Sequence, residues 1–77
     1  MNLKLPRNIK EIDKKELMDL LFYYRQQAYW IDTHDPDRKI YFIAYHILEE
    51  NITKVRLEFN RRLYKQNIKE LKNRTYE

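Results

Sequence analysis

The chain has 77 residues and contains no cysteine, no glycine and no serine. Without cysteine it has no disulfide, no thiolate nucleophile and no cysteine-based zinc site. Without glycine it lacks phosphate-binding loops, the EF-hand loop and the nucleophile elbow, each of which needs glycine at a fixed position. Tight β-hairpins are disfavoured too, since their turns need positive φ. We therefore predict an all-α protein without catalytic residues, metal, cofactor or small-molecule substrate.

Long apolar runs are also missing. The first twelve residues hold no apolar segment of the kind that marks a secretory signal. The longest apolar stretch, from Ile40 to Leu48, is interrupted by His46 and is too short to span a bilayer. The apolar face of residues 52–71 is modest and has no tryptophan, which disfavours a membrane-surface helix. We expect a cytoplasmic protein that does not bind membranes.

The residues that are abundant include lysine, asparagine, isoleucine and tyrosine, whereas alanine occurs only twice. Their codons are AT-rich, so this composition favours a bacterial, phage or prophage origin. Charge is unevenly placed within a net charge of +4. Residues 1–50 carry eight basic and nine acidic side chains, and residues 51–77 carry eight basic and three acidic ones. The excess positive charge therefore lies entirely on the last third of the chain.

The start of the chain predicts an extended arm followed by a helix. Pro6 biases Leu5 away from helix, and we expect residues 1–12 to form the arm. Asp13 and Glu16 form a capping-box pattern, which predicts a helix over residues 14–31. Apolar residues then recur at alternating spacings of four and three, a heptad-like pattern that predicts one buried face. These residues are Leu17, Leu21, Tyr24, Ala28 and Ile31.

A second helix is predicted over residues 36–73. Asp35 is a suitable N-cap and Pro36 fits the first helical position. The heptad-like spacing continues through Tyr41, Tyr45, Leu48, Ile52, Val55 and Phe59. No glycine or proline interrupts the helix, so we favour a helical hairpin with one long C-terminal helix. The alternative is a break near Asn51 that gives a three-helix arrangement.

The unequal helix lengths predict self-association. A helix of 18 residues is about 27 Å long at 1.5 Å per residue, so it covers only half of the longer one. The uncovered part still carries apolar residues, namely Phe59, Leu63, Tyr64, Ile68 and Leu71. Small cores barely offset the entropy of ordering a chain. We therefore expect a homodimer with coiled-coil-like packing.

The segment between the helices holds the largest group of potential metal ligands: Asp32, His34, Asp35 and Asp37. Clustered carboxylates suit hard cations, but this segment lacks the glycine and the bidentate glutamate of an EF-hand loop. Asp35 and Pro36 are already explained as helix-start residues. We therefore interpret the cluster as structural, with a metal-binding or general-base role as the alternative.

Aromatic residues are concentrated between Phe22 and Tyr45, which hold eight of the eleven in the chain. Consecutive helical residues point about 100° apart, so these rings cannot all enter one core. Exposed tyrosine and tryptophan are typical of protein interfaces. We predict that the protein is a small non-enzymatic regulator or adaptor that binds another protein. The residues that we expect to contact that protein are Tyr23, Trp30, Phe42, Phe59 and Leu63.

A basic row on the second helix supports an alternative function, the binding of nucleic acid. Its residues recur at roughly helical spacing and could follow a phosphate backbone. They are Lys54, Arg61, Arg62, Lys65, Lys69 and Lys72. A solvated helix face would show the same pattern, and no helix-turn-helix spacing is present. Protein binding is therefore the favoured function.

Overall fold

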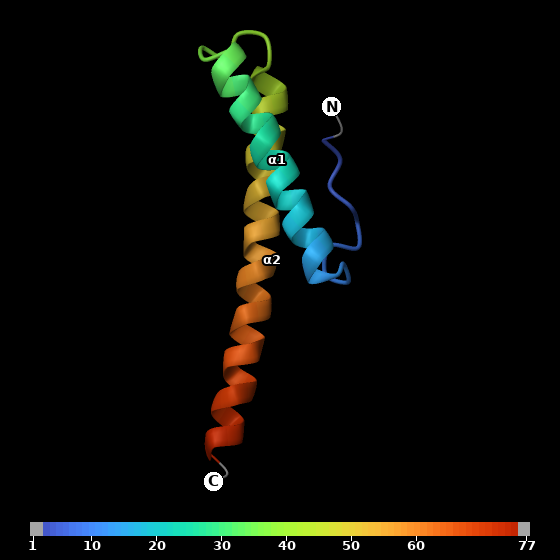
Figure 1. Ribbon diagram of the computed structural model, residues 1–77, viewed down its shortest axis with the longest axis vertical. Coiled ribbons are helices and arrows are strands. Elements are labelled where there is room, and N and C mark those ends of the chain that lie inside the picture. The colour runs from blue at the N-terminus through green and yellow to red at the C-terminus, as the bar shows by residue number, and fades with distance from the viewer. Residues whose placement is uncertain (1–2, 76–77) are drawn as a thin grey trace.

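The computed structural model describes residues 3–75, which form two antiparallel helices and an N-terminal arm (Figure 1). Helix α1 covers Lys14–His34 and helix α2 covers Phe42–Thr75. The described residues contain no strand. The prediction of an all-α helical hairpin is confirmed.

The core lies where the two heptad-like faces meet. On α1, the fully buried residues Leu17, Tyr24 and Ile31 are seven residues apart. On α2, Leu48 and Val55 are also fully buried and seven residues apart. Repeats of seven keep one side of a helix toward its neighbour over several turns. The remaining predicted core positions are half-buried against this cluster, among them Leu21, Ala28, Tyr41, Tyr45, Ile52 and Phe59.

The arm adds a third layer beside the hairpin. Figure 1 shows residues 3–12 running beside α1 to its base, where the chain turns and enters the helix. The Asn51 side-chain amide donates a hydrogen bond to the Leu3 carbonyl at 2.6 Å, and the Tyr24 hydroxyl donates to the Lys4 carbonyl at 3.4 Å. Ile12, at the end of the arm, is buried in the core cluster. The arm is thus bound to both helices by polar and apolar contacts.

The connection between the helices differs from the prediction. Helix α1 continues to His34 rather than ending at Ile31, and α2 begins at Phe42 rather than at Pro36. Asp35 is therefore not the N-cap of a helix that starts at Pro36. Its backbone N–H donates to the Ile31 carbonyl at 2.7 Å, which closes α1 instead.

The buried Asp35 carboxylate explains why the second helix starts late. It accepts hydrogen bonds from the backbone N–H groups of Lys39, Ile40 and Tyr41 at 3.1, 2.9 and 2.8 Å. These bonds hold residues 39–41 in a loop that leads into α2. The loop also contains Arg38 in the left-handed region, with φ of 53°. A side chain disfavours that region, so other contacts must hold the turn there.

The start of α1 also corrects one detail. Asp13 precedes the helix as predicted, but its side chain makes no capping hydrogen bond, so the capping-box interpretation is wrong. The neighbouring apolar pair accounts for the helix start instead. Ile12 and Leu17 are both buried in the same cluster, as expected for a hydrophobic staple.

Helix α2 is continuous, so the three-helix alternative is wrong. Asn51 does not begin a new helix, because its side chain is buried and donates to the arm. At 1.5 Å per residue, the 34 residues of α2 span roughly 51 Å and the 21 residues of α1 roughly 32 Å. The described chain measures 58 × 21 × 16 Å, and the last turns of α2 extend beyond α1 (Figure 1). Neither of these helices is apolar enough over a sufficient length to cross a membrane.

Candidate protein-binding surfaces

The closed end of the hairpin carries a set of stacked rings. The Trp30 and His34 rings lie parallel, with centroids 4.3 Å apart and an interplanar angle of 14°. The Tyr41 ring meets Trp30 edge-on at 5.4 Å. His34 Nδ1 lies 2.9 Å from the Trp30 carbonyl oxygen, which orients the imidazole. The indole is therefore fixed on two sides while 41% of the Trp30 residue stays exposed.

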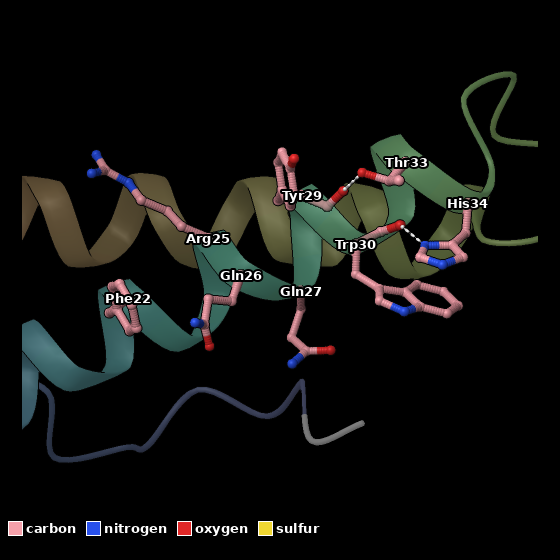
Figure 2. Close-up of a pocket in the computed structure, with 8 residues that line it drawn as sticks. All are labelled: Phe22, Arg25, Gln26, Gln27, Tyr29, Trp30, Thr33 and His34. Atoms are coloured by element: carbon pink, nitrogen blue, oxygen red, sulfur yellow. Dashed lines mark hydrogen bonds between the residues drawn. The ribbon is translucent and has the colours of Figure 1, made fainter.

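A shallow groove of about 650 Å³ runs along the same side of α1. Figure 2 shows the side chains that line it, with Phe22 at one end and the stacked Trp30 and His34 at the other. The Thr33 hydroxyl donates to the Tyr29 carbonyl at 3.0 Å. Between the rings lie Arg25, Gln26 and Gln27, which can donate hydrogen bonds. The rings of this groove can contact apolar side chains of a bound protein, and its polar side chains can donate hydrogen bonds to backbone carbonyls of that protein.

Four large side chains at the closed end are exposed, and we call them the tip cluster: Tyr29, Trp30, Ile40 and Phe42. Ile40 is 81% and Phe42 65% exposed. Two of the four, Trp30 and Phe42, come from the sequence prediction. The third predicted aromatic, Tyr23, is half-buried against the core with its ring edge-on to Tyr24 at 5.8 Å. The expectation that Tyr23 belongs to an exposed patch is therefore wrong.

The other predicted contact residues lie farther along α2. Phe59 is half-buried against the core, so our expectation that it is uncovered is wrong. It lines an apolar groove of about 380 Å³ between the helices, together with Met18, Leu21 and Phe22. Leu63 lies beyond this groove and is 56% exposed. The structure therefore separates these two residues from the tip cluster.

A buried carboxylate organises the region where the arm meets α2. Glu58 accepts hydrogen bonds from the guanidinium groups of Arg61 and Arg62, the latter at 3.2 Å. These bonds, chiefly those from Arg61, lower the pKa of Glu58 from its ordinary value to about 2. Arg62 also donates to the Ile12 carbonyl at 2.6 Å and to the Ile9 carbonyl at 3.3 Å. Arg62 thus connects α2 to the arm.

This network divides the predicted basic row. Arg61 and Arg62 are half-buried and paired with Glu58, so they have a structural role in the fold. The other four residues of the row are exposed: Lys54, Lys65, Lys69 and Lys72. At about 100° per residue, these four fall within an arc of about 60° on α2. They form a narrow positive stripe, which we call the lysine stripe.

The acidic segment between the helices is occupied by internal contacts. Hydrogen bonds from backbone N–H groups, that of Tyr41 most of all, lower the pKa of Asp35 below its ordinary value. Asp32 pairs with Arg38 at 2.9 Å, and the Arg38 guanidinium lies 3.9 Å above the centre of the Tyr45 ring. Within residues 3–75, no three histidine or acidic side chains come together as a metal site. Asp32 and Asp35 therefore each have partners within the chain.

Sequence reasoning missed three buried polar residues: Asp35 as a loop acceptor, Asn51 and Glu58. Glu58 had a visible signal, because Arg61 and Arg62 follow it at the i+3 and i+4 spacings of helical ion pairs. Asn51 had none, since its acceptor, the Leu3 carbonyl, is 48 residues away in the sequence. Comparison of the chain with models of protein families, with curated proteins and with solved structures finds no match.

Proposed function

We propose that the protein is a small non-enzymatic regulator or adaptor that acts by binding another protein through the tip cluster. The observation that carries the proposal is the exposure of Trp30, Ile40 and Phe42 together at one end of the hairpin. Large aromatic side chains of this kind contribute a major share of binding energy at protein interfaces. Lone exposed apolar residues are common, but several at one end of a small protein indicate a contact surface.

The rigidity of the closed end supports this proposal. The Asp35 carboxylate holds residues 39–41 through three backbone hydrogen bonds, and Arg38 is fixed by Asp32 and by the Tyr45 ring. A surface that is already ordered loses less conformational entropy when it binds. The loop that carries Ile40 and leads into Phe42 is therefore preorganised for a partner.

Affinity capture with matched variants tests the proposal. The wild-type chain, an Ile40→Ser/Phe42→Ala variant and a Leu63→Ala variant would each be used as bait in an extract of the native host. A captured protein would then be purified, and its affinity measured with each variant. We expect the tip variant to weaken binding at least tenfold, because loss of a central anchor costs more than about 1.4 kcal/mol. Equal binding by wild type and tip variant would exclude the tip cluster, and loss only in Leu63→Ala would place the contact on distal α2.

The lysine stripe favours a second candidate function, the binding of nucleic acid. Four exposed ammonium groups on one side of α2 can neutralise phosphates without reading sequence. With about four phosphate contacts, a plot of log binding constant against log salt concentration should have a slope of about −3 to −4. Lys65→Glu/Lys69→Glu/Lys72→Glu should abolish such binding to a duplex or a single strand, whereas Ile40→Ser/Phe42→Ala should not. A measured affinity that neither salt nor this triple variant changes would exclude the function.

A further inference from the structure

A row of exposed side chains runs along α2 on the side opposite the core. Leu57 comes nine residues after the buried Leu48, and Tyr64 comes nine residues after the buried Val55. At about 100° per residue, nine residues are two full turns and a further half turn, so Leu57 and Tyr64 lie on the opposite side of the helix. The row follows a strict seven-residue repeat, and we call it the outer row: Ile43, Glu50, Leu57, Tyr64 and Leu71. Its apolar members are 72, 60, 67 and 61% exposed, in chain order.

A seven-residue apolar repeat is the pattern by which one helix packs along another over a long distance. The core-facing repeat of α2 is already used by α1. The outer row is a second repeat on the same helix, and it spans both the part covered by α1 and the part that extends beyond it. We propose that two copies of this chain pack along their outer rows as an antiparallel homodimer.

Charge decides which occupant and which direction fit the row. Residues 30–50, at the closed end, contain five acidic and two basic side chains. Residues 58–72, toward the opposite end, contain five basic side chains and two acidic ones, one of which, Glu58, is paired with Arg61 and Arg62. An antiparallel second copy brings each acidic end beside a basic end, whereas a parallel copy brings like charges together. The chain is thus electrostatically complementary to a reversed copy of itself.

The seven-residue repeat and the distribution of charge together fix the register of the two helices. With Leu57 on the two-fold axis, outer-row residues at equal distances before and after it face one another across the interface. Ile43 then lies beside Leu71 of the partner subunit, and Glu50, in the row itself, lies close to Lys65 of the partner subunit. A register centred on Tyr64 would instead place Lys54 near Lys72 of the partner subunit, on the same side of the interface, where the like charges repel. We therefore assign the axis to Leu57.

Single cysteines test this register directly, because the wild-type chain has none. A disulfide requires Cα atoms within about 7 Å, a condition that a residue at a two-fold axis can meet. Under mild oxidation, we expect Leu57→Cys to form a covalent dimer and Tyr64→Cys not to form one. A mixture of Glu50→Cys and Tyr64→Cys chains should form a cross-linked heterodimer. Cross-linking of Tyr64→Cys alone, equal cross-linking of both single variants, or a monomer by sedimentation at about 100 μM would each overturn the proposal.

A charge swap provides a test that does not depend on cysteine geometry. Glu50→Lys and Lys65→Glu should each weaken the dimer about tenfold, since each reversal turns two symmetry-related attractions into repulsions. Both changes in the same chain should restore wild-type affinity. Lys10→Glu on the arm is the matched control and should have no effect. Failure of the double variant to recover would refute the antiparallel pairing. Ile40→Ser/Phe42→Ala should dimerise normally, so this result is separable from partner binding at the tip cluster.

Discussion

At the scale of single residues, buried carboxylates position the parts of this fold that lack regular structure. Glu58 is 5% exposed, yet it stays ionised because two guanidinium groups donate to it. A buried charge costs free energy unless it is paired and hydrogen-bonded. Glu58 therefore acts together with Arg61 and Arg62 as one unit, and removal of one member leaves the others without their partner.

Glu58→Gln should lower the free energy of unfolding at pH 7 by about 2 kcal/mol, since it removes hydrogen bonds to charged groups. Because folding lowers the pKa of Glu58 from 4.5 to about 2, its contribution is complete above about pH 5. That contribution is lost as the pH falls toward 2, so the two proteins should converge in stability there. Chemical denaturation between pH 2 and 7 measures the difference. A gap that stays constant over this range would contradict the role of the ionised carboxylate.

Asp35 leads to a second prediction at this scale. The backbone N–H groups of residues 39–41 lower the pKa of Asp35, because they donate to the ionised carboxylate that holds the loop. Asp35 loses this role when the pH falls far enough below the ordinary pKa of aspartate to protonate the carboxylate. Asp35→Ala should destabilise the protein more than Asp35→Asn, which keeps one acceptor oxygen. Hydrogen exchange at the amides of Lys39, Ile40 and Tyr41 should accelerate in both variants. Asp37→Ala, an exposed neighbour, is the control, and equal exchange in all variants would refute the role of Asp35.

At the scale of elements, the helices follow from local pattern and their connections do not. Leu17, Tyr24 and Ile31 on α1, and Leu48 and Val55 on α2, were predictable because a seven-residue repeat needs only nearby sequence. The late start of α2 was not, because Asp35 forms bonds to residues 39–41 that compete with a helix starting at Pro36. Only half of the tip cluster could be predicted. Adjacent aromatic residues on a helix cannot all be buried, but which of them stay exposed depends on how the two helices cross.

The arm is the element whose position depends most on one side chain. Arg62 donates to the carbonyls of Ile9 and Ile12 and also to Glu58, a set of directions that the single ammonium of lysine cannot reproduce. Arg62→Lys should therefore cost about 1–2 kcal/mol in unfolding free energy and increase proteolysis within residues 3–12. Arg61→Lys, which changes hydrogen bonds to Glu58 and none to the arm, is the matched control and should leave proteolysis within residues 3–12 unchanged. Equal proteolysis of the two variants within residues 3–12 would contradict the role of Arg62 in binding the arm.

At the scale of the whole molecule, the chain is a rod with an acidic closed end and a basic opposite end. The axis assigned to Leu57 lies near the middle of α2, so the rods of the proposed dimer overlap almost completely. The dimer should then have twice the mass at nearly the same length, close to the 58 Å of one chain. An axis at Tyr64 would shift each copy by seven residues and lengthen the dimer by about 20 Å at 1.5 Å per residue.

Small-angle X-ray scattering at low salt measures this length together with the mass. We expect the mass of two chains and a maximum dimension within a few Å of the single rod. Raising salt should shift the mass toward one chain, because the attraction between the acidic and basic ends is screened over about 8–10 Å at physiological ionic strength. Glu50→Lys should already have the lower mass at low salt, and Glu50→Lys/Lys65→Glu should regain the higher one. A dimer about 20 Å longer would move the axis to Tyr64, and a dimer insensitive to salt and to both variants would show that charge does not set its direction.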